Sequence, residues 1–384
     1  MLQKLDIITN ERRIGKKRAS VVVIGTIIAI LKQYRGKSFE DSYHQQFRLN
    51  SEHYMTFIIT YLDYNLQELY ERKHKQLLSF LSEHFSRINM NPKIRVVCVD
   101  GPYRDIFYRD NLDLVVCLDT SLSQVRLLAD HSYLSGYLGL QIFNILLDTE
   151  IPDAFEYGKR QAMASMTKLI ANNPLHSLSP SLMTTNQHLK AYYGSFVLKK
   201  LHRRQVIMNQ VLKYIRPGFE NSKKRFHQTD IQCLSALVFN SDAKVANNIG
   251  AIIYKYPSDA DLSDEAFETK LNDLNYHGVG THFAITKLGP IIKYFGAKDP
   301  SKIRKQFDVF FTFSMAEIGS KYGVTDMMIG ADEQFEYPMY INAAINIESM
   351  TVHLSLSISS DLIDMDAIKA NFPGIIREFD LNDL

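Results

Sequence analysis

The sequence has few cysteines, and this limits the kinds of site that it can build. Cys98, Cys117 and Cys233 are the only three in 384 residues, and each lies within an apolar run. Their separations do not match the ligand spacing of a zinc site, so we expect no metal centre. Their odd number and apolar surroundings predict free thiols in a reducing compartment.

Charge of one sign is also scarce. The formal net charge is only +2, a balance that gives no reason to expect a nucleic-acid partner. The sequence also contains no Gly-rich phosphate loop, no Ser/His/Asp grouping, no internal repeat and no low-complexity segment. These absences leave single side chains, rather than compact motifs, as the candidates for chemistry.

The sequence has no apolar run long enough to cross a membrane. Residues 21–31 are apolar and have basic residues on both sides, but a span needs roughly 20 residues. Residues 29–36 contain no small-x-small cleavage site, so we expect no signal peptide. We predict a buried helix or strand in a cytoplasmic protein. The alternative is a membrane-surface anchor in which residues 12–37 contact anionic lipid.

The composition is that of a folded protein, with 46% hydrophobic and 22% charged residues. A chain of 384 residues exceeds the length that one core usually serves, which predicts two halves. The best linker is the proline-containing segment 172–181. We therefore expect a basic and apolar N-terminal extension at 1–40, an N-terminal half at 41–175 and a C-terminal half at 176–384.

Strand and helix patterns alternate along both halves. Residues 55–62 read as a buried strand, and Asn65 offers an N-cap for the amphipathic helix that follows. Further patterns predict strands at 93–99, 112–118, 248–256 and 306–314, and a hairpin of 339–347 with 350–359. We expect helices at 162–169, 229–239, 264–274 and 361–372, and a glycine-containing turn at 277–280. The fold class that this order predicts is an α/β sandwich.

The stretch 124–148 is the strongest candidate for a site. It begins with a strand pattern, breaks at His131, passes Gly136 and continues with helical spacing. A strand followed by a loop and a helix can hold one imidazole rigidly at the end of a sheet, which makes His131 a candidate general base. The alternative is that His131 is an ordinary loop histidine, one of 12 in the chain.

The His131 loop resembles the H-x-x-x-D-G signature of the chloramphenicol acetyltransferase-like superfamily. That superfamily includes condensation domains, plant BAHD acyltransferases and alcohol acetyltransferases. The order of elements over residues 42–379 is similar as well, with the predicted helix 229–239 opening the second half. The resemblance implies a two-layer sandwich of two chloramphenicol acetyltransferase-like halves with a central tunnel.

The signature departs from the family at two positions. Ser135 stands where the family has an aspartate, and Asp130 stands where a second histidine is common, whereas Gly136 is kept. In the family the aspartate pairs with a buried arginine and shapes the loop, and a serine cannot satisfy a buried guanidinium. Residues 322–326, Y-G-V-T-D, lie near where the plant branch has D-F-G-W-G.

The resemblance implies an acyltransferase that moves an acyl group from a coenzyme A thioester to a hydroxyl or amine. His131 would be the base, Ser135 and Gly136 would shape its loop, and Thr312 and Ser314 would face the tunnel as oxyanion donors. Acyl-CoA would be a co-substrate, with no permanently bound cofactor and no metal. The residues that bind coenzyme A and the oligomeric state stay unassigned.

Two other functions remain open. One is a condensation-type enzyme whose thioester is bound to an acyl carrier protein. The other is a catalytically inactive relative that acts as a binding or assembly module, which the change to Ser135 favours. The basic clusters 199–204 and 223–225 could bind coenzyme A phosphates, an acidic carrier protein or RNA, or they could be solvated helix faces.

Overall fold

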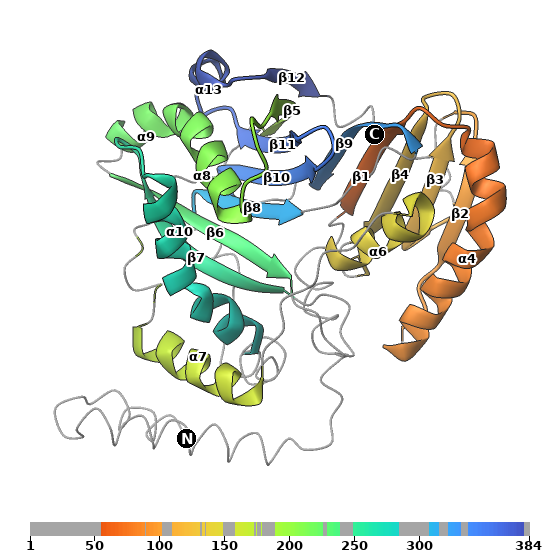
Figure 1. Ribbon diagram of the computed structural model, residues 1–384, viewed down its shortest axis with the longest axis horizontal. Helices are drawn as coiled ribbons and strands as arrows, with labels where there is room; N and C mark the ends of the chain where they lie inside the picture. Colours follow the sequence, from red (N-terminus) through yellow and green to blue (C-terminus); the bar gives the residue numbers. More distant parts are fainter. Residues whose placement is uncertain are drawn as a thin grey trace.

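The structure, a computed structural model, contains two β-sheets that lie side by side (Figure 1). One strand from the second part of the chain is exchanged into the sheet that the first part forms. It describes residues 55–88, 90–101, 110–130, 133–134, 136–148, 158–172, 174, 178, 189–225, 229–238, 249–283, 307–314, 322–331 and 337–379. The N-terminal apolar run at 21–31 lies outside these ranges. Within them, no helix is long and apolar enough to cross a bilayer.

The first sheet has five strands in the order β2-β3-β4-β1-β9, of which only the β2–β3 pair is parallel. Its strands are β1 (Met55–Leu62), β2 (Ile94–Val99), β3 (Leu114–Asp119), β4 (Gln124–Asp130) and β9 (Val324–Ala331). Four of the five come from the first half of the chain, as the sequence predicted. The fifth, β9, comes from the second half and was not predicted.

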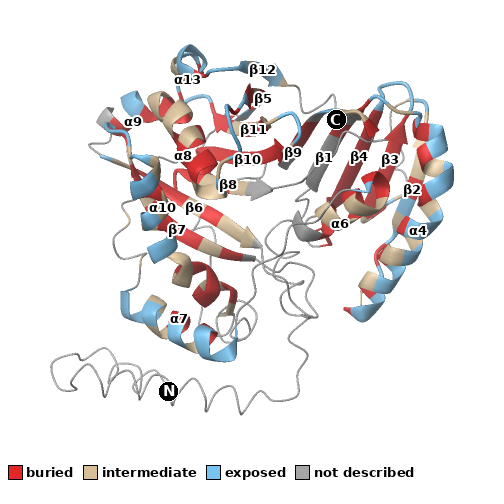
Figure 2. Ribbon diagram, viewed as in Figure 1, coloured by how far each residue is buried: buried red, intermediate tan, exposed pale blue. Residues whose placement is uncertain are grey.

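Helices α4 (Leu66–Arg87) and α6 (Gly136–Leu147) cover one face of this sheet. The predicted N-cap is confirmed, because the Asn65 side chain accepts a hydrogen bond from the Glu68 N–H at 3.2 Å. The buried stripe of α4 has the spacing of an amphipathic helix and consists of Leu66, Leu69, Lys73, Leu77, Leu81 and Phe85. Figure 2 shows the opposite face of α4 as exposed.

The second sheet has seven strands in the order β12-β5-β11-β10-β8-β6-β7. Its strands are β5 (Leu189–Val197), β6 (Asp230–Val238), β7 (Ile249–Pro257), β8 (Val309–Ser314), β10 (Met339–Asn346), β11 (Thr351–Ser359) and β12 (Ile375–Phe379). The predicted hairpin of β10 and β11 is confirmed, with Asn346 opposite Thr351 at its closed end.

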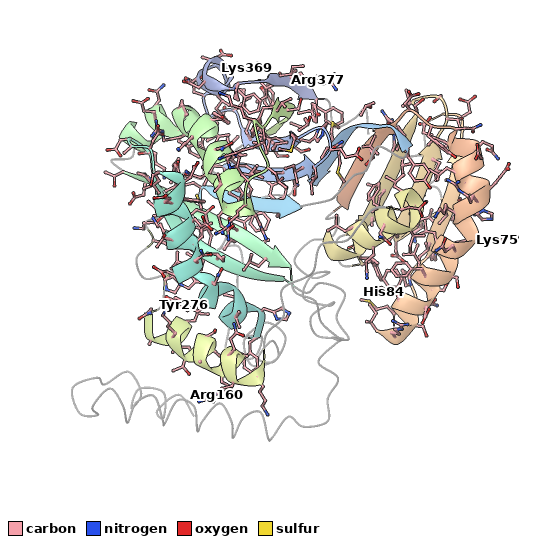
Figure 3. All side chains as sticks on the ribbon, in the orientation of Figure 1. Lys75, His84, Arg160, Tyr276, Lys369 and Arg377 are labelled. Atoms are coloured by element: carbon pink, nitrogen blue, oxygen red, sulfur yellow. The ribbon has the colours of Figure 1, made fainter. Side chains whose placement is uncertain are left out.

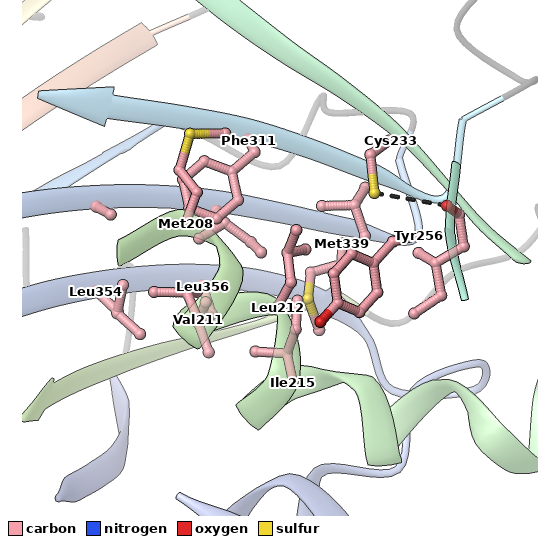
Figure 4. Packing of buried hydrophobic residues seen from close by; sticks show 14 of the residues in the cluster. Met208, Val211, Leu212, Ile215, Cys233, Tyr256, Phe311, Met339, Leu354 and Leu356 are labelled. Carbon is pink, nitrogen blue, oxygen red and sulfur yellow. Dashed lines mark hydrogen bonds between the residues drawn. The ribbon is translucent and has the colours of Figure 1, made fainter. Parts of the chain in front are cut away.

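Helices cover the outer face of the second sheet and form the larger core with it. They are α8 (Arg204–Ile215), the 3-10 helix η2 (Arg216–Phe219), α9 (Glu220–Arg225), α10 (Asp264–Asp273) and α13 (Met365–Asn371). Figure 4 shows how Met208, Val211 and Leu212 of α8 pack against Phe311 and Leu354 of the sheet. The helix α7 (Lys159–Asn172) lies apart from this core, below β7 in Figure 1.

Two secondary-structure predictions are wrong. The predicted helix at 229–239 is instead strand β6. Its side chains alternate as in a strand: Ile231 and Cys233 face the larger core, whereas Leu234 faces the other side of the sheet. Residues 277–280 are part of a helix at 275–283 rather than a turn. A Cβ atom at Gly280 would lie 3.1 Å from the Leu169 side chain, so this glycine serves close packing against α7.

The strand β9 joins the two halves. It lies between β1 and the β10–β11 hairpin, and Tyr322 immediately before it is buried against the first half. The Tyr322 hydroxyl donates to Asp148 Oδ2 at 2.5 Å and accepts from Arg72 at 3.0 Å, while Lys73 contacts Asp148 Oδ1 at 2.5 Å. Residues 322–326, which stand near where the plant branch has D-F-G-W-G but lack that motif, therefore begin with a polar latch between the halves, formed by Tyr322 and Asp148, and lead into β9.

A buried ion pair lies within the second half. Lys223 Nζ is 2.5 Å from Asp308 Oδ2, and both side chains are almost completely inaccessible. The same Asp308 oxygen also accepts the Gln232 N–H at 2.8 Å, so it connects α9, β6 and the start of β8. Removal of the cation would leave the carboxylate buried without its charge partner, a costly arrangement.

We predict that Lys223→Met destabilises the protein by about 3–5 kcal/mol, measured by chemical denaturation. The matched control is Lys213→Met. Lys213 is a partly exposed lysine whose nearest carboxylate oxygen, on Asp264, is 3.8 Å away, so the loss should be only about 0–1 kcal/mol. Equal losses for the two variants would contradict a special role for the buried pair.

Candidate functional site

The second sheet has one apolar and one polar face, and the polar face is the candidate site. Along β10, Met339, Ile341 and Ala343 point into the larger core. The alternate residues Tyr340 and Asn342 point to the opposite face, where Asn342 is nevertheless only 5% exposed. Polar groups buried on the inner face of a sheet need a reason, because burying them costs free energy unless they are hydrogen-bonded.

The strand register places a row of polar side chains across this face. Asn342 is paired with Thr312 on one side and with Ser355 on the other. Ser355 is paired in turn with Tyr193, and Tyr193 with Arg377 on the edge strand β12. The Arg377 guanidinium lies over the Tyr193 ring at 5.2 Å from its centroid, and Figure 3 shows Arg377 at the upper edge of the molecule.

Tyr193 and His353 form a buried polar pair in this row. The Tyr193 hydroxyl lies 2.8 Å from His353 Nδ1, and the two side chains are 4% and 3% exposed. Tyr193 also packs against the first sheet, where it contacts a cluster that includes Val115 and Leu128. The pair therefore lies where the two sheets meet, and Leu128 is only two residues before the end of β4.

Asn342 is the centre of a second polar group. Its Oδ1 accepts hydrogen bonds from the Thr312 hydroxyl and, at 3.2 Å, from the Tyr340 hydroxyl. Burial raises the pKa of Tyr340 to about 12, while the hydrogen bonds with Thr312 and Asn342 lower it. The phenol therefore keeps its proton near neutral pH and can donate it to Asn342.

Three stacked aromatic rings, here called the aromatic shelf, lie next to this group. The Phe310 ring centroid is 5.2 Å from that of Tyr337 and 5.2 Å from that of Tyr340, with interplanar angles of 14° and 16°. Ile253 and Phe307 belong to the same cluster. The polar face thus has hydrogen-bonding groups next to buried, stacked aromatic rings.

The two residues of the sequence motif that matter most, His131 and Ser135, lie outside the described residues. The structure does describe what flanks His131. Strand β4 ends at Asp130, whose carbonyl accepts the Tyr133 N–H at 2.9 Å, and Gly136 is the first residue of α6. The strand and helix that were predicted around His131 are therefore confirmed, while the role of the histidine stays a prediction.

The two other predicted site residues are both on β8. Thr312 belongs to the polar row, and its hydroxyl donates to Asn342. Ser314 is the last residue of the strand. Asn342, Tyr193 and His353, which the strand register brings to the same face, were not predicted from the sequence. The alternation of polar and apolar residues in H-L-S-L-S, residues 353–357, was a signal for His353 alone.

The cysteines show no sign of a reactive or metal-binding role. Burial, followed by the nearby Asp119, raises the pKa of Cys117 to about 12, and burial also raises the pKa of Cys233. Cys98 packs on the α4 side of the first sheet and Cys117 on the opposite side. The described residues contain no group of histidine, cysteine and carboxylate side chains that could hold a metal ion.

The basic clusters divide into exposed and buried residues. Lys199 and Lys200 are exposed, and Arg203 pairs with Glu268 of α10. Arg204 is half-buried, and this burial lowers the pKa of its guanidinium to about 10, while the guanidinium donates to the Ala236 carbonyl at 2.8 Å. Lys223 forms the internal ion pair described above. Arg204 and Lys223 therefore support the fold rather than a solvated phosphate site.

Comparison with solved structures identifies the fold. The starter condensation domain of rhizomide synthetase RzmA, a double mutant in complex with C8-CoA and Leu-SNAC, matches with a TM-score of 0.53 at 6% identity. The match covers 85% of this chain and 90% of that one. TRI101 of F. sporotrichioides, complexed with coenzyme A and T-2, matches with a TM-score of 0.52 at 11% identity, over 86% and 96% of the two chains.

No protein-family model and no curated protein matches the sequence. At 6–11% identity the structural matches show the fold alone. The chain therefore has the α/β fold of these two structures, which agrees with the fold that the sequence resemblance implied.

We predict that Tyr193→Phe destabilises the protein by about 1–3 kcal/mol, because His353 loses a buried hydrogen-bond partner while the ring packing is kept. Thermal or chemical unfolding would measure the change. The matched control is Tyr192→Phe. Tyr192 is the neighbouring residue of β5 on the opposite face, and its hydroxyl makes only a long 3.5 Å contact with Glu378. A control variant that loses as much stability would contradict the role of the buried pair.

Proposed function

We propose that the protein is an acyltransferase that moves an acyl group from a coenzyme A thioester to a hydroxyl or amine, with His131 as the general base. The observation that supports this most is the buried polar face of the second sheet. Its Tyr193 packs beside Leu128 of β4, the strand that leads directly to His131. The face provides hydrogen-bonding groups beside β4, the strand that precedes the predicted base in the sequence.

The reaction requires one proton acceptor and one oxyanion donor. A neutral His131 would take the proton of the acceptor hydroxyl or amine as the acceptor oxygen or nitrogen attacks the thioester carbonyl. When the tetrahedral intermediate collapses, the carbon–sulfur bond breaks, and the leaving thiolate receives the proton from His131. The products are the acylated acceptor and free coenzyme A, with no acyl-enzyme and no redox change.

The proposed substrates follow the fold. The two matching structures are complexes with coenzyme A or an acyl-CoA together with a second small molecule. By analogy, the thioester and the acceptor would reach His131 through a tunnel between the halves, with Thr312 and Ser314 on its wall. Ser135 and Gly136 would shape the loop, and the halves would divide near residue 175.

Two other functions remain as alternatives. A condensation-type enzyme would use the same residues but would take its thioester from an acyl carrier protein. A catalytically inactive binding or assembly module is favoured by one observation, namely Ser135 in place of the family's aspartate.

We place the protein in the cytoplasm. Residues 12–37 would contact membrane lipid if the apolar run at 21–31 is an anchor.

The first test measures thioester consumption by the full chain with acetyl-CoA and longer acyl-CoA donors, against a panel of alcohols and amines. We expect His131→Ala to lower turnover by about 100- to 10,000-fold, the range of a general base. The matched control is His202→Ala, a histidine in the loop between β5 and α8. Turnover that stays at the uncatalysed rate in the native protein would favour the binding module.

A second experiment distinguishes the two donors. If the donor is an acyl-CoA, the protein should also bind the product, free coenzyme A. Free coenzyme A at 100 times its Kd should then stabilise the protein by about 2.7 kcal/mol, seen as a higher Tm. The absence of a shift with coenzyme A, together with turnover of a carrier-bound thioester, would favour the condensation-type alternative. Ser135→Asp should change Tm more than turnover, and a large gain in turnover would contradict this expectation.

A further inference from the structure

The side-chain amide of Asn342 has one satisfied and one unsatisfied end. Its oxygen accepts from two hydroxyl groups, those of Thr312 and Tyr340. Its nitrogen is buried and makes no hydrogen bond to any residue that the structure describes. An amide nitrogen has two N–H donors, and leaving them unpaired in the interior costs about 1–3 kcal/mol. An unsatisfied buried donor in a native protein needs an explanation, and a bound ligand or ordered water and a catalytic role are among those known.

The two hydroxyls determine which end of the amide is available. Both hydroxyl oxygens lie against Asn342 Oδ1, and Thr312 Oγ1 also lies 3.4 Å from the Ile341 carbonyl oxygen, so the amide nitrogen points away from both hydroxyls. Thr312 lies beside Asn342 in the β8–β10 register, and Tyr340 is two residues away on the same face of β10. Neither side chain is on a mobile loop, so the direction of the amide N–H groups is set by the sheet itself.

The position of Asn342 fits a ligand held between the two sheets. Asn342 lies on the polar face of β10, two residues before Ala344 on the same face. Ala344 packs within the core cluster of the first half. Two residues along a strand correspond to about 7 Å. The unsatisfied N–H groups are therefore one strand repeat from the junction of the halves, beside the aromatic shelf of Phe310 and Tyr340.

We propose that Asn342 Nδ2 donates a hydrogen bond to the carbonyl oxygen of the acyl thioester and stabilises the oxyanion that forms during transfer. This inference rests on the proposed function and refines it. Thr312 then becomes a positioning residue, because its hydroxyl proton is used to orient Asn342 rather than to contact the substrate. A neutral amide suits a neutral carbonyl that gains negative charge only in the transition state.

The chemical class of ligand follows from the donor. Two N–H groups on a neutral nitrogen recognise an oxygen acceptor, and a thioester carbonyl offers one. The stacked aromatic rings of Phe310, Tyr337 and Tyr340 next to it favour an acyl chain or ring over a highly charged group. The phosphates of coenzyme A would need cationic partners and should lie elsewhere.

The kinetic test compares variants that keep or remove the donor in the full chain. Asn342→Leu has a similar volume and no N–H, and we expect it to lower kcat by about 100- to 1,000-fold with little change in KM. Thr312→Val should lower kcat by a smaller factor because the amide loses its orientation. Thr312→Ser keeps the hydroxyl and should recover at least tenfold of the kcat that Thr312→Val loses.

The spectroscopic test needs no turnover. An acyl-CoA with a ¹³C-labelled carbonyl should show a lower carbonyl stretching frequency when it is bound to His131→Ala protein than when it is bound to the His131→Ala/Asn342→Leu double variant. The reason is that only the first protein offers the oxygen the Asn342 hydrogen bond. Should Asn342→Leu fail to fold, judged by its Tm, Asn342→Ser is the second variant, since it removes the amide with less change in the core.

The outcomes separate this inference from the proposed function. If turnover depends on His131 but Asn342→Leu keeps native kcat and the carbonyl frequency, the inference is wrong and the proposed function stands. If His131→Ala does not affect turnover but the carbonyl frequency still depends on Asn342, the amide binds the carbonyl and another residue must be the base. If neither residue matters, both are wrong.

Discussion

The exchange of β9 is the interaction on which the rest of the structure depends. Without β9, the first sheet would end at β1 with unpaired backbone groups, and the second half would have no strand in the first. The exchange fixes the distance between the sheets, so that Tyr193 of one meets Leu128 of the other. The latch of Tyr322 on Asp148 then ties the start of β9 to the end of α6, the helix that follows the His131 loop.

The second sheet is mixed, with β8 parallel to both of its neighbours, and its two faces serve different purposes. One face is almost entirely apolar and is covered by helices, so it provides stability. The other face carries polar residues that a solvent-exposed sheet would show to water, but here the first sheet covers part of it. A buried polar face specifies hydrogen-bond partners strictly, because each unmet donor or acceptor is costly. This explains the specific pairing of Tyr193 with His353 and of the Asn342 side-chain oxygen with two hydroxyls.

Much of the fold follows from local patterns in the sequence. Strand β1, the capped helix α4 and the β10–β11 hairpin were predictable because each has a clear period and recognisable ends. Strand β6 was not, because Thr229 and Asp230 look like a helix cap and the apolar residues after them fit either period. The polar row was invisible for a different reason: Thr312, Asn342 and Tyr193 become neighbours only through strand pairing, and a sequence does not show its register.

The exchanged strand has a consequence for how the chain reaches its native state. During synthesis the strands β1 to β4 leave the ribosome long before Ala331, the last residue of β9. Until then the nascent first sheet has an apolar edge at β1, and such edges pair readily with other chains. Newly made protein should therefore depend on molecular chaperones until translation has passed the second half, even though the finished molecule has that edge fully covered.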